Sequence, residues 1–325
     1  MIRKTIKLLS GFCLGTMALL AGASAHASFP DRPITMLIGF APGGGADTIG
    51  RIIAEKMSTI LGQPIIVQNK PGANSTIAVQ ELVRAKPDGY TILLNAASLS
   101  IASAVYKNIP FDVDKDLAPI SLLATHSYLL TVPAGLPSKT FKEFVDYAKS
   151  HKGEVNYGSS GIGSAPHMGM ELFASATGLD MNHVPYKGSN PANIDLAAGR
   201  VSAMLTNYLG AAAMIQSNKF RILAVTSKER SAVLPDVPTM AELGYPNVEV
   251  LGWYSLDAPA GVPADIIDTI SRAAAKAMSD PEMVKHLRTQ DVVVVGSTPS
   301  EYRVFFDNEL AKWKRVASQA DISLD

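Results

Sequence analysis

The feature that most constrains the fold of this chain is a repeated alternation between short apolar runs and segments with helical periodicity. Residues 34–40, ITMLIGF, form an apolar and β-prone run. The apolar residues that follow are spaced as one face of a helix, namely Ile49, Ile52, Ile53, Met57, Ile60 and Leu61. Gly62 fits the position just beyond the end of that helix. Apolar strands separated by helices are typical of parallel sheets that helices cover on both faces.

The same alternation continues along the chain and predicts an α/β fold with mostly parallel sheets flanked by helices. Further strand-like runs are PIIVQN, GYTILLN, YLLTV, VNYGS, VSAMLTN, RILAVT, VLGWYSLDA and DVVVVG. Helices are expected at residues 76–85, 140–151, 164–177, 189–198, 263–278 and 299–320. Two loop-rich zones, residues 110–119 and 228–246, indicate that the chain enters a second domain and later returns.

The first residues have the pattern of a secretory signal peptide. Arg3, Lys4 and Lys7 form a basic start, and an apolar stretch runs from Leu8 to about Gly22. Ala25-His26-Ala27 is a small-x-small cleavage site, so we expect residues 1–27 to be removed. A membrane anchor is the alternative, but the stretch is short for a span. The single cysteine, Cys13, lies inside this leader, so the mature chain would hold no disulfide.

The charge balance and the length of the chain indicate which partners and which domain organisation to expect. The chain carries 29 basic and 29 acidic residues, and no block or stripe of lysine and arginine is present. Nucleic acid is therefore not an expected partner. A mature chain of nearly 300 residues, from a sequence that is 47% hydrophobic, is long enough for two domains or one large α/β unit. We expect no membrane span after residue 28, because no apolar run there is long enough.

Two glycine-rich loops suggest a nucleotide site or a hydrolase site. Neither interpretation holds, because the residues that these motifs require are missing at the required spacing. In the first, a phosphate-loop frame that starts at Gly39 reaches Gly45 where lysine is required. A dinucleotide frame that starts at Gly43 meets Thr48 where glycine is required. The second loop, around Ser159 and Ser160, lacks the G-x-S-x-G pattern of hydrolases, and the histidines lack metal-binding spacing. We therefore predict no catalytic residue, no metal and no cofactor.

What the two loops share is that each follows a strand and leads into a helix. The first turn of a helix has N–H groups without internal partners, and the helix dipole makes that end positive. Glycine lets a ligand approach the backbone closely, so such a loop binds an anionic group without an arginine. A carboxylate satisfies it as well as a phosphate does. Two such loops suggest a ligand held between two domains.

The order of several segments resembles the Bug receptors, the extracytoplasmic solute-binding proteins of tripartite tricarboxylate transporters. The matching segments are PDRPITMLIGFAPGGGADTIGRIIAEKM, VQNKPGANSTIA, KPDGYTILL, YGSSGIGSAPHMGMELF, VPYKGSNPANIDLAAGRVSAML, LPDVPTMAELG and WYSLDAPAGVP. The resemblance implies a two-domain Venus-flytrap receptor of the periplasm. It places residues 28–126 and 248–325 in one domain and 127–247 in the other, with the ligand cleft between them.

The resemblance also implies which residues of the first domain meet the ligand. The first loop runs from Phe40 to Thr48, with Gly44, Gly45 and Asp47 as the leading candidates. Asp47 is an acid beside a proposed anion site, so capping of the following helix is an equal alternative. Asn74 is a candidate contact, although it is also a residue that bonds its own backbone in turns. Ser98 fits a position that faces the cleft after the third strand.

The second domain supplies the remaining candidates. The carboxylate-facing loop would hold Ser159, Ser160, Gly163 and Ser164. His167 would pack, cap or touch the ligand, and Tyr186 would line the cleft, whereas Lys187 is expected to stay solvated. Thr206 stands where many relatives carry an acid that suits an ammonium group. Its presence favours a ligand without an amine.

The predicted function is capture of a small carboxylate and its delivery to membrane permease subunits. The ligand classes considered are organic acids, aromatic carboxylates and amino acids, and the receptor is expected to be a monomer in the periplasm. A ligand sensor for a signalling partner and a periplasmic hydrolase are the alternatives. A hydrolase would need a serine and a histidine within hydrogen-bond reach of each other.

Overall fold

The computed structural model describes residues 29–319 and residue 324. Every element below lies in the compact unit that begins at Arg32. The expected signal peptide and Cys13 lie outside the described residues. Among the described residues, no helix combines the length and the apolar character that a membrane crossing requires.

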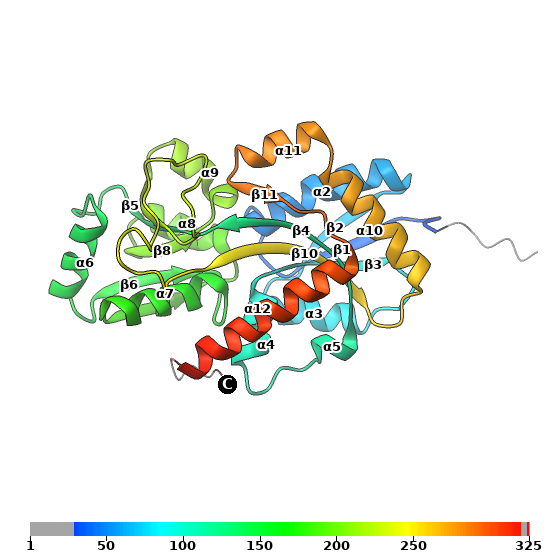
Figure 1. Ribbon diagram of the computed structural model, residues 1–325, viewed down its shortest axis with the longest axis horizontal. Helices are drawn as coiled ribbons and strands as arrows, with labels where there is room; N and C mark the ends of the chain where they lie inside the picture. The colour runs from blue at the N-terminus through cyan, green and yellow to red at the C-terminus, as the bar shows by residue number, and fades with distance from the viewer. Residues whose placement is uncertain (1–28, 320–323, 325) are drawn as a thin grey trace, which may run out of the picture. The chain divides into compact units, whose positions relative to one another are not determined.

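The first of two sheets contains six strands in the order β11-β4-β10-β3-β1-β2 (Figure 1). Its strands are β1 (Ile34–Ile38), β2 (Ile65–Asn69), β3 (Thr91–Ala96), β4 (Leu117–Ser127), β10 (Leu251–Pro259) and β11 (Val292–Val294). β1 is parallel to β2 and β3, whereas β10 is antiparallel to β3 and β4, and β11 is antiparallel to β4. The parallel half is the half that carries the first glycine loop.

The second sheet contains five strands in the order β7-β6-β8-β5-β9. They are β5 (Leu129–Pro133), β6 (Val155–Ser159), β7 (Met181–Pro185), β8 (Ala203–Thr206) and β9 (Phe220–Val225). β6 is parallel to β7 and β8, and β5 is antiparallel to β8 and β9. The predicted α/β class is confirmed, but the expectation of mostly parallel sheets is wrong, since both sheets are mixed.

A short connection joins the two sheets. β4 ends at Ser127 in the first sheet and β5 begins at Leu129 in the second, so one residue separates them. In each sheet the strand at this connection is antiparallel to both of its neighbours, β4 to β10 and β11 and β5 to β8 and β9.

Helices cover both sheets. The six helices predicted from periodicity are present within two residues of their expected ends, as α3 (Thr76–Val83), α6 (Phe141–Ser150), α7 (Ala165–Thr177), α8 (Ser189–Ala197), α10 (Ala264–Met278) and α12 (Pro299–Gln319). The predicted helix after the first glycine loop is α2 (Gly45–Leu61), and Gly62 ends it with φ 70°. The helices that were not predicted are α4 (Ser98–Val105), α5 (Val113–Asp116), α9 (Tyr208–Gln216) and α11 (Pro281–Arg288). α4 and α9 are apolar over most of their length, which hides the helical period.

Aromatic side chains join α12 to the first sheet. α12 lies beside α4 and against β4 (Figure 1). The ring of Trp253 on β10 meets the rings of Tyr302, Phe305 and Phe306 edge-on, with centroids 5.8–6.2 Å apart. Such pairs add to the stability that apolar burial provides. The C-terminal helix is therefore part of the core of this sheet.

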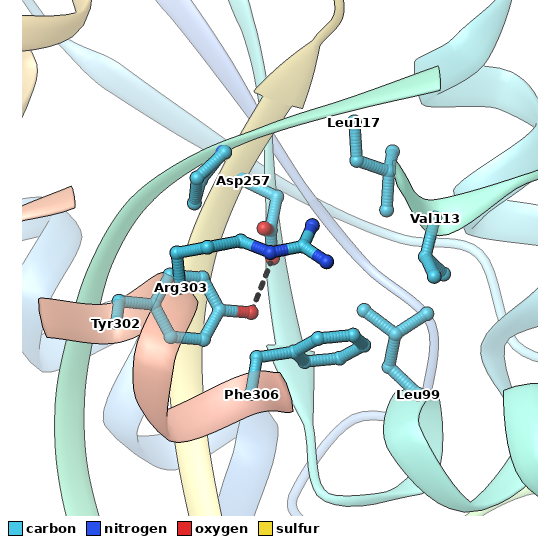
Figure 2. Close-up of a pocket in the computed structure, with 8 residues that line it drawn as sticks. Leu99, Val113, Leu117, Asp257, Tyr302, Arg303 and Phe306 are labelled. Carbon is cyan, nitrogen blue, oxygen red and sulfur yellow. Dashed lines mark hydrogen bonds between the residues drawn. The ribbon is translucent and has the colours of Figure 1, made fainter. Parts of the chain in front are cut away.

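A carboxyl group is buried between this helix and the sheet. Asp257 of β10 is 3% exposed and accepts hydrogen bonds from Asn95 Nδ2 at 2.8 Å and from the Tyr302 hydroxyl at 3.2 Å. It lines a cavity of about 10 Å³ together with Arg303 and Phe306. Figure 2 shows Tyr302 directed at the Asp257 carboxyl group. Burial raises the pKa of Asp257 to about 6, although its hydrogen bonds favour the charged form.

The buried Asp257 makes the stability of the protein depend on pH. Because its pKa is higher in the folded than in the unfolded chain, its stabilising contribution is full below pH 4 and is lost as the pH rises to about 6. Relative to Asp257→Asn, we expect the free energy of unfolding to fall by about 2 kcal/mol between pH 4 and pH 7. Urea unfolding of both proteins at each pH measures this difference. A difference that stays constant or rises with pH would contradict the assignment.

Candidate ligand-binding site

The first glycine loop leads from β1 into α2 and leaves the start of α2 open. Gly44 precedes the helix in an extended conformation, and no side chain caps the first turn. A Cβ atom at Gly45 would lie 2.5 Å from the Tyr254 hydroxyl and 2.6 Å from Asn207 Oδ1. Only glycine fits there, because Tyr254 and Asn207 approach the backbone closely.

The second loop leads from β6 into α7 and is shaped by two glycines at positive φ. Gly161 has φ 142° and Gly163 has φ 73°. Ser164 caps α7 by accepting a hydrogen bond from the His167 N–H group at 3.3 Å. The turn leaves Ser160, which is 6% exposed, facing two cavities.

The smaller cavity, which we call the helix-end cavity, has a volume of about 30 Å³. Its lining residues come from both sheets and are Phe40, Gly44, Gly45, Ala46, Ala96, Ser98, Tyr128, Ser160, Ser189, Asn207 and Tyr254. Four helices begin at this cavity, since Gly45, Ser98 and Ser189 are the first residues of α2, α4 and α8, and Asn207 precedes α9. Among the residues that the structure describes, no side chain caps α2, α4 or α8. The electrostatic character of the cavity is therefore positive although no lysine or arginine lines it.

The larger cavity, which we call the turn cavity, has a volume of about 230 Å³. It is lined by Gly39, Phe40, Gly72, Ala73, Asn74, Tyr106, Ser160, Gly161, Ile162, Pro185, Tyr186 and Lys187. Phe40 and Ser160 line both cavities, so the two are adjacent. Within residues 29–319 and residue 324, no aspartate or glutamate lines either of them.

The structure brings part of the predicted set together at these cavities. Phe40, Gly44, Gly45, Ser98 and Ser160 line the helix-end cavity. Phe40, Asn74, Ser160 and Tyr186 line the turn cavity. The other predicted residues line neither cavity and are Asp47, Ser159, Gly163, Ser164, His167 and Thr206.

Asp47 holds the first loop in place instead of facing a cavity. Its carboxylate accepts hydrogen bonds from the Gly43 N–H group at 3.0 Å, from Asn69 Nδ2 at 2.9 Å and from Arg51 Nε at 3.0 Å. Asn69 also donates to the carbonyl oxygen of Phe40. Burial alone would raise the pKa of Asp47, but these hydrogen bonds and the charge of Arg51 hold it below its usual value. The contacts favour the structural alternative for this residue.

Ser159 and His167 belong to a buried cluster behind the second loop. Ser159 Oγ lies 2.6 Å from His183 Nε2, and the His183 ring stacks on that of His167 with centroids 3.9 Å apart. Burial lowers the pKa of both histidines to about 4, and mutual repulsion also lowers that of His183. His167 Nδ1 accepts a hydrogen bond from the Gly163 N–H group at 3.0 Å. A neutral His167 thus supports the loop.

The serine–histidine pair that a hydrolase requires is present, but it is poorly placed for catalysis. Ser159 has no exposed surface and lines neither cavity. Its hydroxyl also lies 3.1 Å from the carbonyl oxygen of Gly161, and no carboxylate is hydrogen-bonded to His183. A nucleophile needs both an accessible position and an oriented base.

Thr206 and Tyr186 have clear local roles. Thr206 Oγ1 lies 2.9 Å from Thr131 Oγ1, and this pair is buried between β8 and β5. The Tyr186 ring lines the turn cavity, while its hydroxyl donates to Asp195 Oδ2 at 2.7 Å. Burial, with the hydrogen bond to Asp195, raises the pKa of Tyr186 to about 12.

Several residues that line the cavities were not predicted. At the helix-end cavity they are Ala46, Ala96, Tyr128, Ser189, Asn207 and Tyr254, and at the turn cavity the larger ones are Tyr106, Ile162 and Lys187. Asn207 had a usable signal, because it follows an apolar strand and is a preferred residue before a helix. Tyr128 and Tyr254 had none, since only the pairing of β4, β10 and β3 brings them to the cavity.

Comparison with known proteins identifies the family. The model of the tripartite tricarboxylate transporter family receptor matches residues 49–322, so the chain belongs to this family. It is 34% identical to Protein BugT of Bordetella pertussis over 316 residues, which is 97% of each chain. The structure of the periplasmic binding protein BugD superposes with a TM-score of 0.88 at 31% identity, covering 91% of this chain and 99% of BugD. The family and these neighbours are solute-binding receptors.

Two further solved structures carry ligands. A protein of R. palustris with adipate has a TM-score of 0.88 at 31% identity, covering 91% of this chain and 99% of its own. MatC of Rhodopseudomonas palustris with bound malate has a TM-score of 0.85 at 30% identity, and the match covers 89% of this chain and 99% of MatC. Both comparisons support the two-domain α/β fold described above.

The role of Asp47 can be tested by removing its charge. Asp47→Asn loses the ion pair with Arg51, so we expect the free energy of unfolding to fall by about 2 kcal/mol at pH 7. Because the folded-state pKa of Asp47 is lowered, the difference from wild type should shrink as the pH falls below 4. Asp236→Asn, at an exposed position, is the control and should change stability little. Urea unfolding of the three proteins decides the point, and an unchanged Asp47→Asn would contradict it.

Proposed function

We propose that this protein captures a small carboxylate at the helix-end cavity and delivers it to the membrane permease of a tripartite tricarboxylate-type transporter. The observation that carries the proposal is the convergence of four helix starts, three of them without a side-chain cap, on one cavity that no acidic or basic side chain of the described residues lines. Unpaired N–H groups at a helix start bind an anion. The relatives with adipate and malate support a carboxylate as that anion.

The two sheets contribute to the site from different segments of the chain, which supports a cleft between two domains. We propose residues 28–126 with 248–325 as one domain and 127–247 as the other. Contacts join the proposed domains near the cavities, where the Ala41 N–H group donates to the carbonyl oxygen of Lys187 at 3.0 Å. Asn190 Nδ2 donates to the carbonyl oxygen of Pro42 at 3.1 Å. A ligand that bridges the domains would stabilise this closed arrangement.

The lining also favours a ligand without an amine. An ammonium group would need an acceptor such as a carboxylate, and no acidic side chain within the described part of the chain lines either cavity. Thr206 at the end of β8 is bonded to Thr131, so it does not replace an acid there. Among the classes considered, organic and aromatic acids therefore fit better than amino acids.

The remaining parts of the proposal follow from the leader sequence and the family. The receptor would be exported, cleaved after Ala27 and active in the periplasm as a monomer. It would bind its solute without turnover and without a cofactor. A role as a ligand sensor uses the same cleft chemistry, and loss of uptake on gene deletion separates transport from sensing.

A ligand screen tests the proposal. The purified receptor is heated with members of a panel of amine-free carboxylates, amino acids, sugars and phosphate. At a hundredfold excess over the dissociation constant, a ligand stabilises the folded state by about 2.7 kcal/mol, which raises the melting temperature by several degrees. We expect one or more amine-free carboxylates to do so. No response to any carboxylate, or a response confined to sugars, would contradict the proposal.

A substitution at the start of α2 locates the site. Gly45→Ala places a methyl group 2.5 Å from the Tyr254 hydroxyl, within the space that the anion would share. We expect carboxylate affinity to fall at least tenfold, or about 1.4 kcal/mol. Gly135→Ala is the matched control, since a methyl group there meets nothing within 4 Å. Calorimetric titration gives the affinities, and circular dichroism checks folding. Equal affinities for the two variants would place the anion elsewhere.

A further inference from the structure

The wall of the turn cavity contains a backbone conformation that glycine would adopt more easily. Ala73, Asn74 and Ser75 follow one another with φ values of 43°, 49° and 74°. Non-glycine residues visit this left-handed region singly and with strain, and glycine has no such penalty. A run of three side chains there destabilises the fold. Three non-glycine residues thus occupy positions at which glycine would make the folded state more stable.

Hydrogen bonding within the protein does not explain why Asn74 occupies this turn. Asn74 is 8% exposed, and within the described chain neither Nδ2 nor Oδ1 has a hydrogen-bond partner. Buried amides are normally paired, because an unpaired one loses its hydration without replacement. The turn therefore combines strain with an unsatisfied amide. Such combinations concentrate at ligand sites, where the ligand supplies the missing partner.

The position of Asn74 relative to the proposed anion site indicates what that partner is. Asn74 lines the turn cavity, which adjoins the helix-end cavity through Phe40 and Ser160. Gly161, next to Ser160, packs directly against Asn74, since a Cβ atom at Gly161 would lie 3.8 Å from Asn74 Cα and Cβ. A ligand anchored by one carboxylate at the helix starts would thus extend past Phe40 and Ser160 toward Asn74.

The charge of this wall is set by Lys187. It lines the turn cavity and is exposed, and among the described residues it makes no ion pair. No carboxylate of the described residues lines the cavity to neutralise it. An amide donor and an ammonium group at one cavity favour an anionic oxygen over an apolar end or a cation.

We propose that Asn74 is a specificity-determining residue and that, with Lys187, it selects ligands carrying a second carboxylate at the end remote from the helix starts. Asn74 Nδ2 donates to that second carboxylate, and Lys187 supplies the opposite charge. This inference rests on the proposed function, because it takes the first carboxylate to lie at the helix-end cavity.

Matched pairs of ligands test the inference by calorimetric titration. The pairs are pentanoate with glutarate and hexanoate with adipate, which differ only in the second carboxylate. Wild type should bind the diacid of at least one pair ten times or more tighter than the monoacid. Asn74→Gly should lose at least tenfold in affinity for that diacid and little for the monoacid.

Thermal stability separates this role from a structural one. Asn74→Gly relieves the left-handed strain and removes the unpartnered amide, so its melting temperature without ligand should rise. If Asn74 stabilised the fold, the melting temperature of Asn74→Gly without ligand would be lower than that of wild type. Ala73→Gly is the matched control, because it relieves similar strain without removing a polar group. It should raise the melting temperature and keep the diacid preference.

A second variant covers the case in which Asn74→Gly does not fold. Asn74→Asp tolerates the left-handed conformation and places a negative charge in the wall. It should weaken diacid binding at least tenfold at pH 7 while monoacid binding changes less. Equal binding of diacids and monoacids to wild type, or an unchanged preference in the Asn74 variants, overturns the inference and leaves the proposed function standing. Failure of every carboxylate to bind wild type overturns the proposed function itself.

Discussion

The site depends on helix starts that no side chain of the protein caps. α6, α7 and α11 begin at Thr140, Ser164 and Asp280, whose side chains each accept a hydrogen bond from the first turn. α2, α4 and α8 open on the helix-end cavity without such a cap. Three helix starts without a side-chain cap therefore meet at this cavity, beside α9, which Asn207 caps. An anion in the cavity would complete the hydrogen bonding of helices that belong to both sheets, which gives a physical reason for a ligand to favour closure.

Most polar side chains near the site shape the backbone and leave recognition to other groups. Asp47, with Arg51 and Asn69, fixes the first loop, and the buried histidines His167 and His183 lie behind the second. Gly45 and Gly163 allow the close approach of Tyr254 and Tyr106. Asn74 is the exception, since its amide is buried at a cavity wall with no partner among the described residues. One set of residues therefore stabilises the loops, and a different set would bind the ligand.

The sequence predicted those parts of the structure that depend on local pattern. The period of apolar residues placed α2, α7, α10 and α12, and the resemblance to the Bug receptors implied Gly44, Gly45 and Ser160, which line a cavity. Features that depend on the pairing of strands distant in the sequence were not predicted correctly. β5 and β10 are antiparallel to their neighbours, Tyr254 reaches the cavity through strand register, and Tyr128 reaches it from the connection between β4 and β5. The role of Asp47 was left open because its partner Asn69 lies 22 residues away and carries no pattern that marks it.

The central claim is that backbone N–H groups at the starts of α2 and α4 hold the ligand carboxylate. Backbone amide NMR tests it most directly, because an N–H proton moves downfield when it donates to an anion. With a carboxylate that stabilises the protein, the account predicts the largest downfield shifts at Gly45, Ala46 and Ser98, and small shifts at Gly135 and Gly153. Saturating ligand with no change at Gly45, Ala46 and Ser98 would contradict the account.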